Sequence, residues 1–496
     1  MPLRVYNTLS QAKEPFQTVT PGKVGMYVCG PTVYSESHVG HMVGPVIFDT
    51  IKRYLVYLGY DVTWVVNITD VDDKLIVQAR NEGTTVSELA TRITDDYLRC
   101  LKALGVDGID HMPRATEYIA EIQEITRGLI DKGFAYPSSG DVYFDVTRAP
   151  DYGKLSHRDP EELQAGARIE PSSIKRHPGD FALWKASKPG EPSWESPWGP
   201  GRPGWHIECS AMSMKLLGEH FDVHGGGLDL VFPHHENEVV QSESYSGKPF
   251  ANFWMHNGLL TRNGKKISKS DPGTIVLMKD LLERYEPDTL RALIISSHYR
   301  RPIDYSTEPG KDRLEELRRG LQTFHKAFER FEALTGERFD RLEAPNRRGE
   351  FDPGASALLN EIARRRDAFL DAMDDDFNTG GAFGSLFEMA HALNRAAHGL
   401  DPTDAAALAD YRRGMVALRE LTNVLGLFRT LPEARPEPSG DGLTPALLGL
   451  LVELRAQVRK DKNFKLADEI RDRLGALGVV LEDRPEGTAW KIVGRG

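Results

Sequence analysis

Residues 24–31, VGMYVCGP, carry a short β-prone run into a loop marked by glycine and proline. Behind the loop, apolar residues recur at helical spacing from Val43 to Leu58, and Gly59 stands where a helix C-cap belongs. Residues 61–67, DVTWVVN, predict a second strand. A strand, a helix and a strand within about 45 residues form a βαβ unit. The opening of the chain therefore predicts an α/β fold with a parallel sheet, whose ligand lies at the carboxyl ends of the strands.

The rest of the chain divides by composition. Residues 188–204 hold five prolines and four glycines and predict an irregular excursion, after which a second α/β stretch begins at Trp205. From Lys311 the sequence becomes helical, and three prolines with two glycines in residues 431–442 indicate a linker. We expect an α/β core at 1–115 and 205–248, an insertion at 116–204, a linker domain at 249–310, a helical bundle at 311–430, the linker at 431–442 and a small C-terminal domain at 443–496.

The composition places the chain among ordinary globular proteins. Its 496 residues suffice for about three domains, and 40 % hydrophobic with 27 % charged residues exclude a disordered, collagenous or membrane-spanning chain. Three widely separated cysteines, Cys29, Cys100 and Cys209, argue against a disulfide framework and for a reducing compartment. Because no stretch resembles a signal peptide or a membrane span, we expect a cytoplasmic protein. The net charge of −11 means that any polyanion must meet a local basic patch.

Two short motifs carry groups suited to phosphate. His38-Val39-Gly40-His41 lies where the first loop becomes a helix, and a helix N-terminus offers free N–H groups and a positive dipole end. Lys266-Ile267-Ser268-Lys269-Ser270 is a basic loop between turn signals, where lysines can stabilise charge that develops on a polyphosphate. Alone, the first motif is equally compatible with two surface histidines, and the second is more typical of a solvated turn.

Together the two motifs resemble the HIGH and KMSKS signatures of class I aminoacyl-tRNA synthetases. Longer segments narrow the resemblance to the cysteinyl-tRNA synthetase family. These segments are residues 29–34 (CGPTVY), 69–74 (TDVDDK), 140–145 (GDVYFD), 204–212 (GWHIECSAM), 224–229 (HGGGLD) and 232–238 (FPHHENE). Ile267 replaces the family's methionine, His41 stands where the family often has asparagine, and residues 271–273 (DPG) differ from the usual Leu-Gly-Asn.

The resemblance implies a fold and an activity. The fold is a class I Rossmann-type core with a parallel sheet, an inserted connective domain, a C-terminal helical bundle and a small terminal anticodon-binding domain. The activity is ATP-dependent formation of cysteinyl-adenylate, followed by transfer of cysteine to the 3′-terminal adenosine of tRNA(Cys). The implied cofactors are one Zn²⁺ per chain and Mg²⁺ with ATP as substrate, and we expect a monomer that does not contact membranes.

Candidate metal ligands can also be found from the residues themselves. His234 and Glu238, spaced i,i+4, share one face of a helix, and Zn²⁺ accepts Cys, His and carboxylate ligands. Cys29 and Cys209 each stand at the predicted end of a strand or loop, and the four residues match the family's zinc ligands. His235 lies i,i+3 from Glu238 and could also reach a metal, so the choice of His234 depends on the resemblance. Cys100 is expected to be a small buried hydrophobic residue.

The family also implies a substrate site. Its members place Thr69, Trp205 and His224 near the amino acid, although Thr69 and Trp205 are as compatible with a buried core. Asp229, after three glycines, is the candidate for the ribose of the nucleotide, because a carboxylate accepts hydrogen bonds from sugar hydroxyls. Gly40 and Lys269 are expected to contact the nucleotide. The residues expected to stabilise the phosphoryl transition state are His38, His41, Lys266 and Lys269.

The tail carries the expected RNA contacts. Trp490 is a candidate platform for stacking an unpaired base, beside a cluster of basic residues. This cluster comprises Arg455, Arg459, Lys460, Lys462 and Lys465. Neighbouring acidic residues leave a solvated helix face as the other interpretation. Within the tail, Leu447, Leu451, Leu454 and Val458 predict one apolar face.

Two other functions remain open at this stage. One is a related ligase that passes activated cysteine to an amino sugar, from which only the basic tail distinguishes this chain. The other is a zinc hydrolase built on His234, His235 and Glu238, which would leave the two phosphate motifs unexplained.

Overall fold

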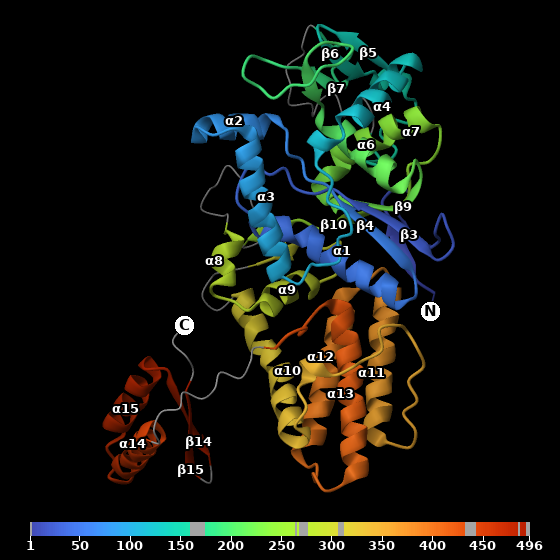
Figure 1. Ribbon diagram of the computed structural model, residues 1–496. Coiled ribbons are helices and arrows are strands. Elements are labelled where there is room, and N and C mark those ends of the chain that lie inside the picture. The colour runs from blue at the N-terminus through green and yellow to red at the C-terminus, as the bar shows by residue number, and fades with distance from the viewer. Residues whose placement is uncertain are drawn as a thin grey trace. The chain divides into compact units, whose positions relative to one another are not determined.

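The structure, a computed structural model, describes residues 2–158, 174–262, 265–266, 276–305, 312–431, 443–484 and 487–492 (Figure 1). It contains two compact units, Met1–Arg429 and Thr430–Gly496. The N-terminal unit opens with an antiparallel hairpin of β1 (Arg4–Asn7) and β2 (Ala12–Pro15).

The core of the N-terminal unit is a four-stranded parallel sheet in the order β10-β9-β3-β4. The strands are β3 (Lys23–Val28), β4 (Asp61–Val66), β9 (Phe221–Gly227) and β10 (Ala251–Asn257). Helix α1 (Val39–Tyr57) crosses from β3 to β4, which confirms the βαβ unit predicted from the opening sequence. Gly59, just behind the C-cap, has φ +102°, a conformation that glycine adopts without strain.

The sheet has a topological switch point between β3 and β9. From β3 the chain crosses to β4 on one side, and from β9 it crosses to β10 on the other. The loop after β3 is fixed at this point, because the backbone N–H of Cys29 donates to the carbonyl of Gly225 at 3.0 Å. Such a switch point opens a crevice at the carboxyl edge of a parallel sheet, which is where these folds bind ligands.

Strand β10 corrects the predicted domain boundary. The division at residue 248 assigned it to the linker domain, whereas Ala251–Asn257 pairs in parallel register with β9. A boundary placed by composition cannot detect this pairing, because the strand's partner is 30 residues upstream in register, with Trp254 opposite His224. The core sheet therefore extends to residue 257.

The inserted segment forms an antiparallel sheet of its own in the order β5-β6-β7-β8. Its elements are α4 (Ile119–Asp131), β5 (Ala135–Ser138), β6 (Asp141–Phe144), β7 (Phe181–Ala186) and β8 (Gly201–Pro203). Buried residues of this sheet, including Phe144 and Leu183, share a hydrophobic core with Ile207 and Val240. These two belong to α6 (Trp205–Leu217) and α7 (Glu236–Ser246), so the insertion packs directly on the helices that follow it.

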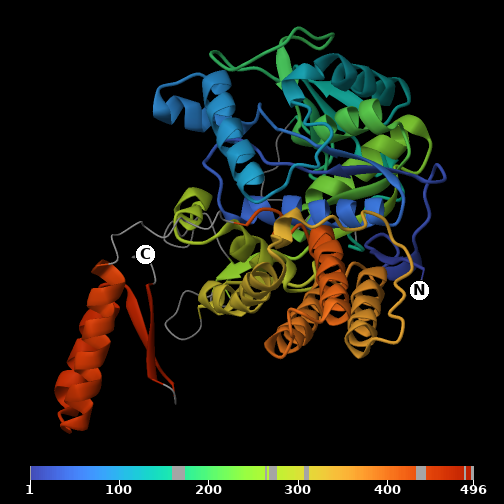
Figure 2. The same cartoon turned by 60° about the horizontal axis from the view of Figure 1, so that its bottom comes forward.

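Helices surround the core sheet. Helix α1 contacts both β4 and the last helix of the bundle and lies between sheet and bundle (Figure 1 and Figure 2). Helices α3 (Val86–Ala103) and α9 (Pro287–Ile295) contact α1, and α2 (Asp73–Glu82) and α8 (Met278–Leu282) contact α3. The bundle consists of α10 (Arg313–Thr335), α11 (Ala357–Asp374), α12 (Thr379–His398) and α13 (Ala405–Leu425). Among the described residues, no helix has the length and apolar character needed to cross a membrane.

A small three-stranded sheet links core and bundle. It has the order β12-β11-β13, with β11 (Leu260–Arg262), β12 (Lys265–Lys266) and β13 (Ile303–Asp304). Strand β11 pairs antiparallel with β12 and parallel with β13.

The C-terminal unit is built from α14 (Leu443–Lys460), α15 (Phe464–Ala476) and the antiparallel pair β14 (Val479–Arg484) and β15 (Gly487–Ile492). Its core is formed by Leu448, Leu474 and Val479, with Leu451 packed against them. The predicted apolar face is wrong in register: Leu447 and Leu454 are 50 % and 48 % exposed. Leu448, one residue from Leu447, takes the buried place instead.

Candidate functional site

The histidine motif forms the N-terminus of α1. His38 is the N-cap, and its Nδ1 accepts a hydrogen bond from the backbone N–H of Gly40 at 3.1 Å. The Nδ1 of His41 accepts from the backbone N–H of His38 at 3.5 Å, and the two rings stack with centroids 3.8 Å apart. Because both Nδ1 atoms act as acceptors, each ring carries its proton on Nε2. The motif thus offers two imidazole N–H donors at a helix N-terminus.

Gly40 is required by this geometry. A Cβ atom at residue 40 would lie 2.9 Å from Cε1 and 3.0 Å from Nδ1 of His38. These contacts are shorter than van der Waals separation, so a side chain at residue 40 would force the His38 ring to shift from its capping position.

Both rings are neutral at pH 7. Burial lowers the pKa of His38. Burial, followed by the repulsion of a charge on His38, lowers the pKa of His41 to about 3. The two imidazoles therefore act through N–H donors and the helix dipole rather than through full positive charges.

The lysine motif falls mainly on undescribed residues. Lys266 ends β12, opposite Thr261 in β11, and Lys269 lies outside the described part of the chain. The chain resumes beside the histidine motif, because Leu277 bridges to His38 and the backbone N–H of Met278 donates to the carbonyl of Ser37 at 2.9 Å. The segment behind the loop is therefore anchored at the start of α1.

The four candidate metal ligands come from four different elements. Cys29 follows β3, His234 lies in a short kinked segment (Val231–His235) that leads into α7, and Glu238 lies in the first turn of α7. Cys209 lies inside α6, which corrects the expectation that it stands at the end of a strand or loop. Its helix begins at Trp205, directly after the proline- and glycine-rich excursion, and its Cys209 side chain faces Cys29.

The distances among these ligand atoms fit a tetrahedral zinc site. In a tetrahedral site, Zn–S bonds of about 2.3 Å place two sulfur atoms about 3.8 Å apart. With Zn–N or Zn–O bonds of about 2.1 Å, sulfur lies about 3.6 Å from nitrogen or oxygen, and nitrogen lies about 3.4 Å from oxygen. The observed Sγ–Sγ distance from Cys29 to Cys209 is 3.8 Å. Cys209 Sγ lies 3.5 Å from His234 Nε2, and Cys29 Sγ lies 3.5 Å from Glu238 Oε1. Only the 3.0 Å from His234 Nε2 to Glu238 Oε1 is somewhat short.

A second set of four groups overlaps the first. Cys29, His224, His235 and Glu238 also bring their ligand atoms within 4.8 Å of one another. Their contacts have hydrogen-bond lengths, with 2.8 Å from His224 Nε2 to Glu238 Oε2 and 3.2 Å from His235 Nε2 to Cys29 Sγ. These spacings are shorter than the edges of a zinc tetrahedron. The geometry therefore favours His234 over His235, a choice that spacing along the sequence left open.

The four candidate ligands differ sharply in pKa. Burial would raise the pKa of Glu238, but His224 and His234 hold it at about 2. Burial would likewise raise the pKa of Cys209, but the hydrogen bond with Cys29 and the neighbouring His234 lower it to about 6. Burial lowers the pKa of His234, yet Glu238 and Cys209 raise it to about 10. Burial and the Cys209 sulfur raise the pKa of Cys29.

The residues expected to contact the substrate amino acid lie around this cluster. Trp205 is 36 % exposed, and its ring stacks on His234 with centroids 4.1 Å apart, so it is not a core residue. Thr69 is buried and donates to Glu208 Oε2 at 3.1 Å. His224 is fully buried, with Nε2 on Glu238. Asp229 lies on the surface in a short 3₁₀ turn (Leu228–Leu230) beyond β9.

Sequence reasoning missed a further set of histidine contacts. His206 Nδ1 lies 2.9 Å from His234 Nδ1. His235 Nδ1 lies 2.7 Å from His256 Nε2, and His256 Nδ1 lies 2.8 Å from Thr8 Oγ1. His206 had a detectable signal, because it stands three residues before Cys209 and so lies one helical turn away. His256 had none, because β10 was assigned outside the core.

The candidate RNA contacts behave differently from one another. Arg455 is buried and forms two hydrogen bonds to Asp483, at 2.7 and 3.0 Å, so it is a structural residue. Arg459 is half exposed and also pairs with Asp483 at 2.7 Å. Lys460, the last residue of α14, and Lys462, in the turn that follows, are both exposed. Trp490 is partly buried against the small core of the unit.

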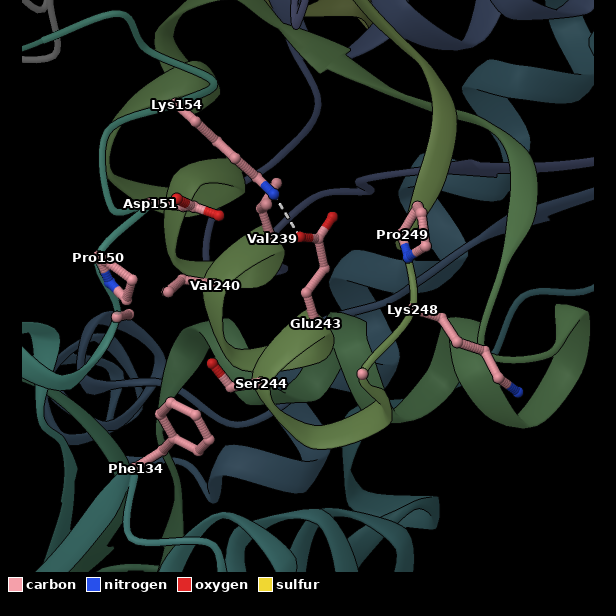
Figure 3. A pocket seen from close by; sticks show the side chains of 12 residues that line it. Phe134, Pro150, Asp151, Lys154, Val239, Val240, Glu243, Ser244, Lys248 and Pro249 are labelled. Atoms are coloured by element: carbon pink, nitrogen blue, oxygen red, sulfur yellow. Dashed lines mark hydrogen bonds and ion pairs between the residues drawn. The ribbon is translucent and has the colours of Figure 1, made fainter.

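A cavity of about 390 Å³ lies between the insertion and α7 (Figure 3). Val239 and Val240 line it on α7, and an ion pair joins Lys154 to Glu243 across it. It contains none of the expected site residues, so it is separate from the metal cluster.

Comparison with protein families matches three segments of the chain. The family described as tRNA synthetases class I (C) catalytic domain matches residues 15–313. The DALR domain matches residues 368–429, and the cysteinyl-tRNA ligase anticodon binding domain matches residues 441–490.

Curated relatives match over nearly the whole chain. The cysteine–tRNA ligase of Geobacter sulfurreducens is 48 % identical over 99 % of this chain and 100 % of its own length. That of Thermococcus onnurineus is 45 % identical over the same shares. Among solved structures, methionyl-tRNA synthetase of Mycobacterium tuberculosis with methionyl-adenylate has a TM-score of 0.58 at 16 % identity, covering 81 % of this chain and 90 % of that one. This last likeness shows the class I synthetase fold.

Proposed function

This chain belongs to the cysteinyl-tRNA synthetase family of class I aminoacyl-tRNA synthetases, and on that premise we propose how its residues select and activate cysteine. The reaction is the ATP-dependent ligation of cysteine to tRNA. In the proposal, Cys29, Cys209, His234 and Glu238 hold one Zn²⁺ at the carboxyl edge of the sheet. The observation that carries this proposal is the match of their mutual distances to a tetrahedral site.

The proposed metal explains how the site distinguishes cysteine from serine. Cysteine and serine differ only in sulfur for oxygen, and an apolar pocket rejects such a near-isostere by only about 10². When bound, zinc supplies a soft Lewis acid that binds a thiolate well and an alkyl hydroxyl poorly. Trp205, which stacks on His234, then covers the amino acid, while Thr69 and His224 complete its surroundings.

The activation step takes place at the start of α1. The carboxylate of cysteine attacks the α-phosphorus of Mg-ATP, and pyrophosphate leaves. His38 and His41 donate Nε2–H hydrogen bonds to the phosphates, and Gly40 leaves room for the capping ring. Lys266 and Lys269 close over the phosphates from the loop, and Asp229 accepts from the ribose hydroxyls.

The transfer step needs no covalent enzyme intermediate. The 2′-hydroxyl of the terminal adenosine of tRNA attacks the acyl carbon of the adenylate, and AMP leaves. Catalysis consists mainly of positioning and electrostatic stabilisation. In the C-terminal unit, Arg459, Lys460 and Lys462 contact the tRNA backbone and Trp490 stacks on a base, whereas Arg455 is withdrawn from this proposal.

The proposed domain division changes at one boundary. The core becomes 1–115 and 205–257, and the linker domain 258–310. The insertion, the bundle, the linker at 431–442 and the C-terminal domain at 443–496 stay as predicted. The monomeric state and the cytoplasmic location also stay predictions.

The ligand assignment is tested by metal content and cysteine binding together. Cys209→Ser should lower both, because it removes one thiolate. Cys100→Ser is the matched control, since Cys100 is buried in α3 and belongs to neither set of candidate ligands. His235→Asn should keep the metal. Full metal content and normal cysteine binding in Cys209→Ser would refute the assignment.

The role of the lysine loop, residues 266–270, is tested by the rate of ATP–pyrophosphate exchange. Lys269→Ala should reduce cysteine-dependent ATP–pyrophosphate exchange by orders of magnitude, and an unchanged rate would remove the loop from the mechanism. Transfer of label from cysteine to total tRNA also distinguishes this function from that of an amino-sugar ligase. Such a ligase would catalyse ATP–pyrophosphate exchange but would not transfer cysteine to tRNA.

A further inference from the structure

The contact between His206 and His234 joins two identical atoms. Their Nδ1 atoms lie 2.9 Å apart, and both rings are buried. A hydrogen bond of this length requires one proton between them, so one ring donates and the other accepts.

The metal ligands decide which ring donates. His234 Nε2 faces Cys209 Sγ at 3.5 Å and Glu238 Oε1 at 3.0 Å. A ring that ligates through Nε2 carries its proton on Nδ1. His206 must then accept this proton through its own Nδ1 and carry its proton on Nε2. This step rests on the proposed role of His234.

The position of His206 is itself fixed by its neighbours. Its ring meets Phe181 edge-on, with centroids 5.4 Å apart. Gln241 Nε2 donates to the His206 carbonyl and to Ser210 Oγ, each at 2.7 Å, and so ties α7 to α6 behind the ring. The acceptor is therefore built into the packing of two helices.

The charge of the site explains why a neutral acceptor suits this position. Three of the four ligands, Cys29, Cys209 and Glu238, are anions when they bind a metal. A divalent cation in this set leaves one net negative charge, and the thiolate of cysteine adds another. Metal-bound histidines commonly donate to a carboxylate, which makes them stronger ligands. Here a carboxylate would add a third negative charge and oppose binding of the substrate thiolate.

We propose that His206 is a positioning residue: it is a neutral acceptor that fixes His234 with Nε2 on the metal and leaves the site able to take the thiolate of cysteine. Metal affinity and cysteine affinity are then set separately. The presence of an acceptor for His234 Nδ1–H governs the affinity for the metal, and the charge of that acceptor governs the affinity for cysteine.

Three substitutions separate these two effects. His206→Leu removes the acceptor, His206→Glu supplies an anionic acceptor, and His206→Gln supplies a neutral one. Each variant is prepared metal-free and titrated with Co²⁺ against a chelating dye. Cysteine is then added to the Co²⁺ form, and the thiolate-to-metal absorption band is followed. His220→Leu is the matched control, because it removes a histidine hydrogen bond of 2.8 Å, to Asn252, away from the ligands.

We expect His206→Leu to lose Co²⁺ affinity by about 10- to 100-fold. His206→Glu should bind Co²⁺ at least as tightly as the parent protein, yet need at least about 10-fold more cysteine to develop the band. His206→Gln should stay close to the parent in both measurements, and the KM for ATP should not change in any variant.

Normal Co²⁺ affinity in His206→Leu, or normal cysteine affinity in His206→Glu, would overturn the proposal. If His206→Leu does not fold, the cysteine affinities of His206→Glu and His206→Gln still test the proposal. Both variants retain an acceptor and differ in its charge. Failure of the proposed function has a different signature: the parent protein itself would bind no Co²⁺ or develop no band with cysteine.

Discussion

Four side chains at the metal cluster hold their protons with very different affinities. At pH 7, Glu238, with a pKa of about 2, is ionised, and Cys209, with a pKa of about 6, is mostly thiolate. His234, with a pKa of about 10, is protonated, and the raised pKa of Cys29 keeps it a thiol. At pH 7 the four groups are thus two anions, one cation and one neutral thiol.

Metal uptake at pH 7 should therefore release about two protons, one from His234 and one from Cys29. The pKa values of His234 and Cys29 are both raised. Below these pKa values each group holds a proton that competes with the metal, and this competition weakens as the pH rises. Metal affinity should increase by about 100-fold per pH unit near neutrality. Calorimetric titration with Zn²⁺ in buffers of different ionisation enthalpy counts the protons, and release of fewer than one would contradict the assigned protonation states.

Gly40 offers a second test at a single residue. Gly40→Ala places a Cβ 2.9 Å from the His38 ring and should displace it from the helix cap. We expect ATP–pyrophosphate exchange to fall by about 10- to 100-fold, because both Nε2 donors move, while metal content stays normal. Gly44→Ala in the same helix is the control, since its nearest neighbour is Asn257 Oδ1 at 3.6 Å. Equal rates in the two variants would remove the capping geometry from catalysis.

At the scale of elements, α1 is fastened to the bundle by buried polar contacts. Tyr57 donates to Glu420 at 2.5 Å, and Arg366 forms hydrogen bonds to both. Tyr54 donates to Asp374 at 2.5 Å in the same way, with Arg348 beside it. Burial and the neighbouring carboxylates raise the pKa of both tyrosines, so they remain hydrogen-bond donors. The far end of the helix that begins with His38 is thus locked in place.

Tyr57→Phe should lower the free energy of unfolding by about 1–3 kcal/mol, because Glu420 loses a buried donor. Tyr60→Phe is the control, since the Tyr60 hydroxyl bonds to none of the residues that the structure describes. Urea unfolding of Tyr57→Phe, Glu420→Gln and the double variant measures the coupling. Additive effects in this cycle would contradict a direct interaction.

Among the elements, those that pair with neighbours in the chain could be predicted from the sequence, and those that pair with distant segments could not. Apolar periodicity and glycine placement were enough for β3, α1 and β4, because these elements pair with chain neighbours. The pairing of β10 with β9 and of Arg455 with Asp483 depends on register between segments that composition cannot order. The four candidate metal ligands were predicted through the resemblance, but the elements that carry them and the preference for His234 over His235 depend on distances between segments far apart in the chain.

For the whole molecule, the two compact units predict separable functions. A chain ending at Arg429 retains the core, the metal cluster and the bundle, and should keep cysteine-dependent ATP–pyrophosphate exchange within about threefold. Aminoacylation of tRNA should fall by on the order of 100-fold, because the basic residues of α14 are gone. A minihelix of the acceptor stem is the control and should be charged equally by both chains. Equal loss on both substrates would contradict the division of roles.

The wide separation of β3 from β9 also has a consequence for synthesis on the ribosome. Glu238 follows Cys29 by 209 positions, which take about 10–40 s to translate at about 5–20 residues per second. Until β9 is made, one edge of β3 stays unpaired, and the insertion lacks the α6 and α7 side chains that complete its hydrophobic core. The four candidate metal ligands can therefore come together only late in translation, after Glu238 has been made.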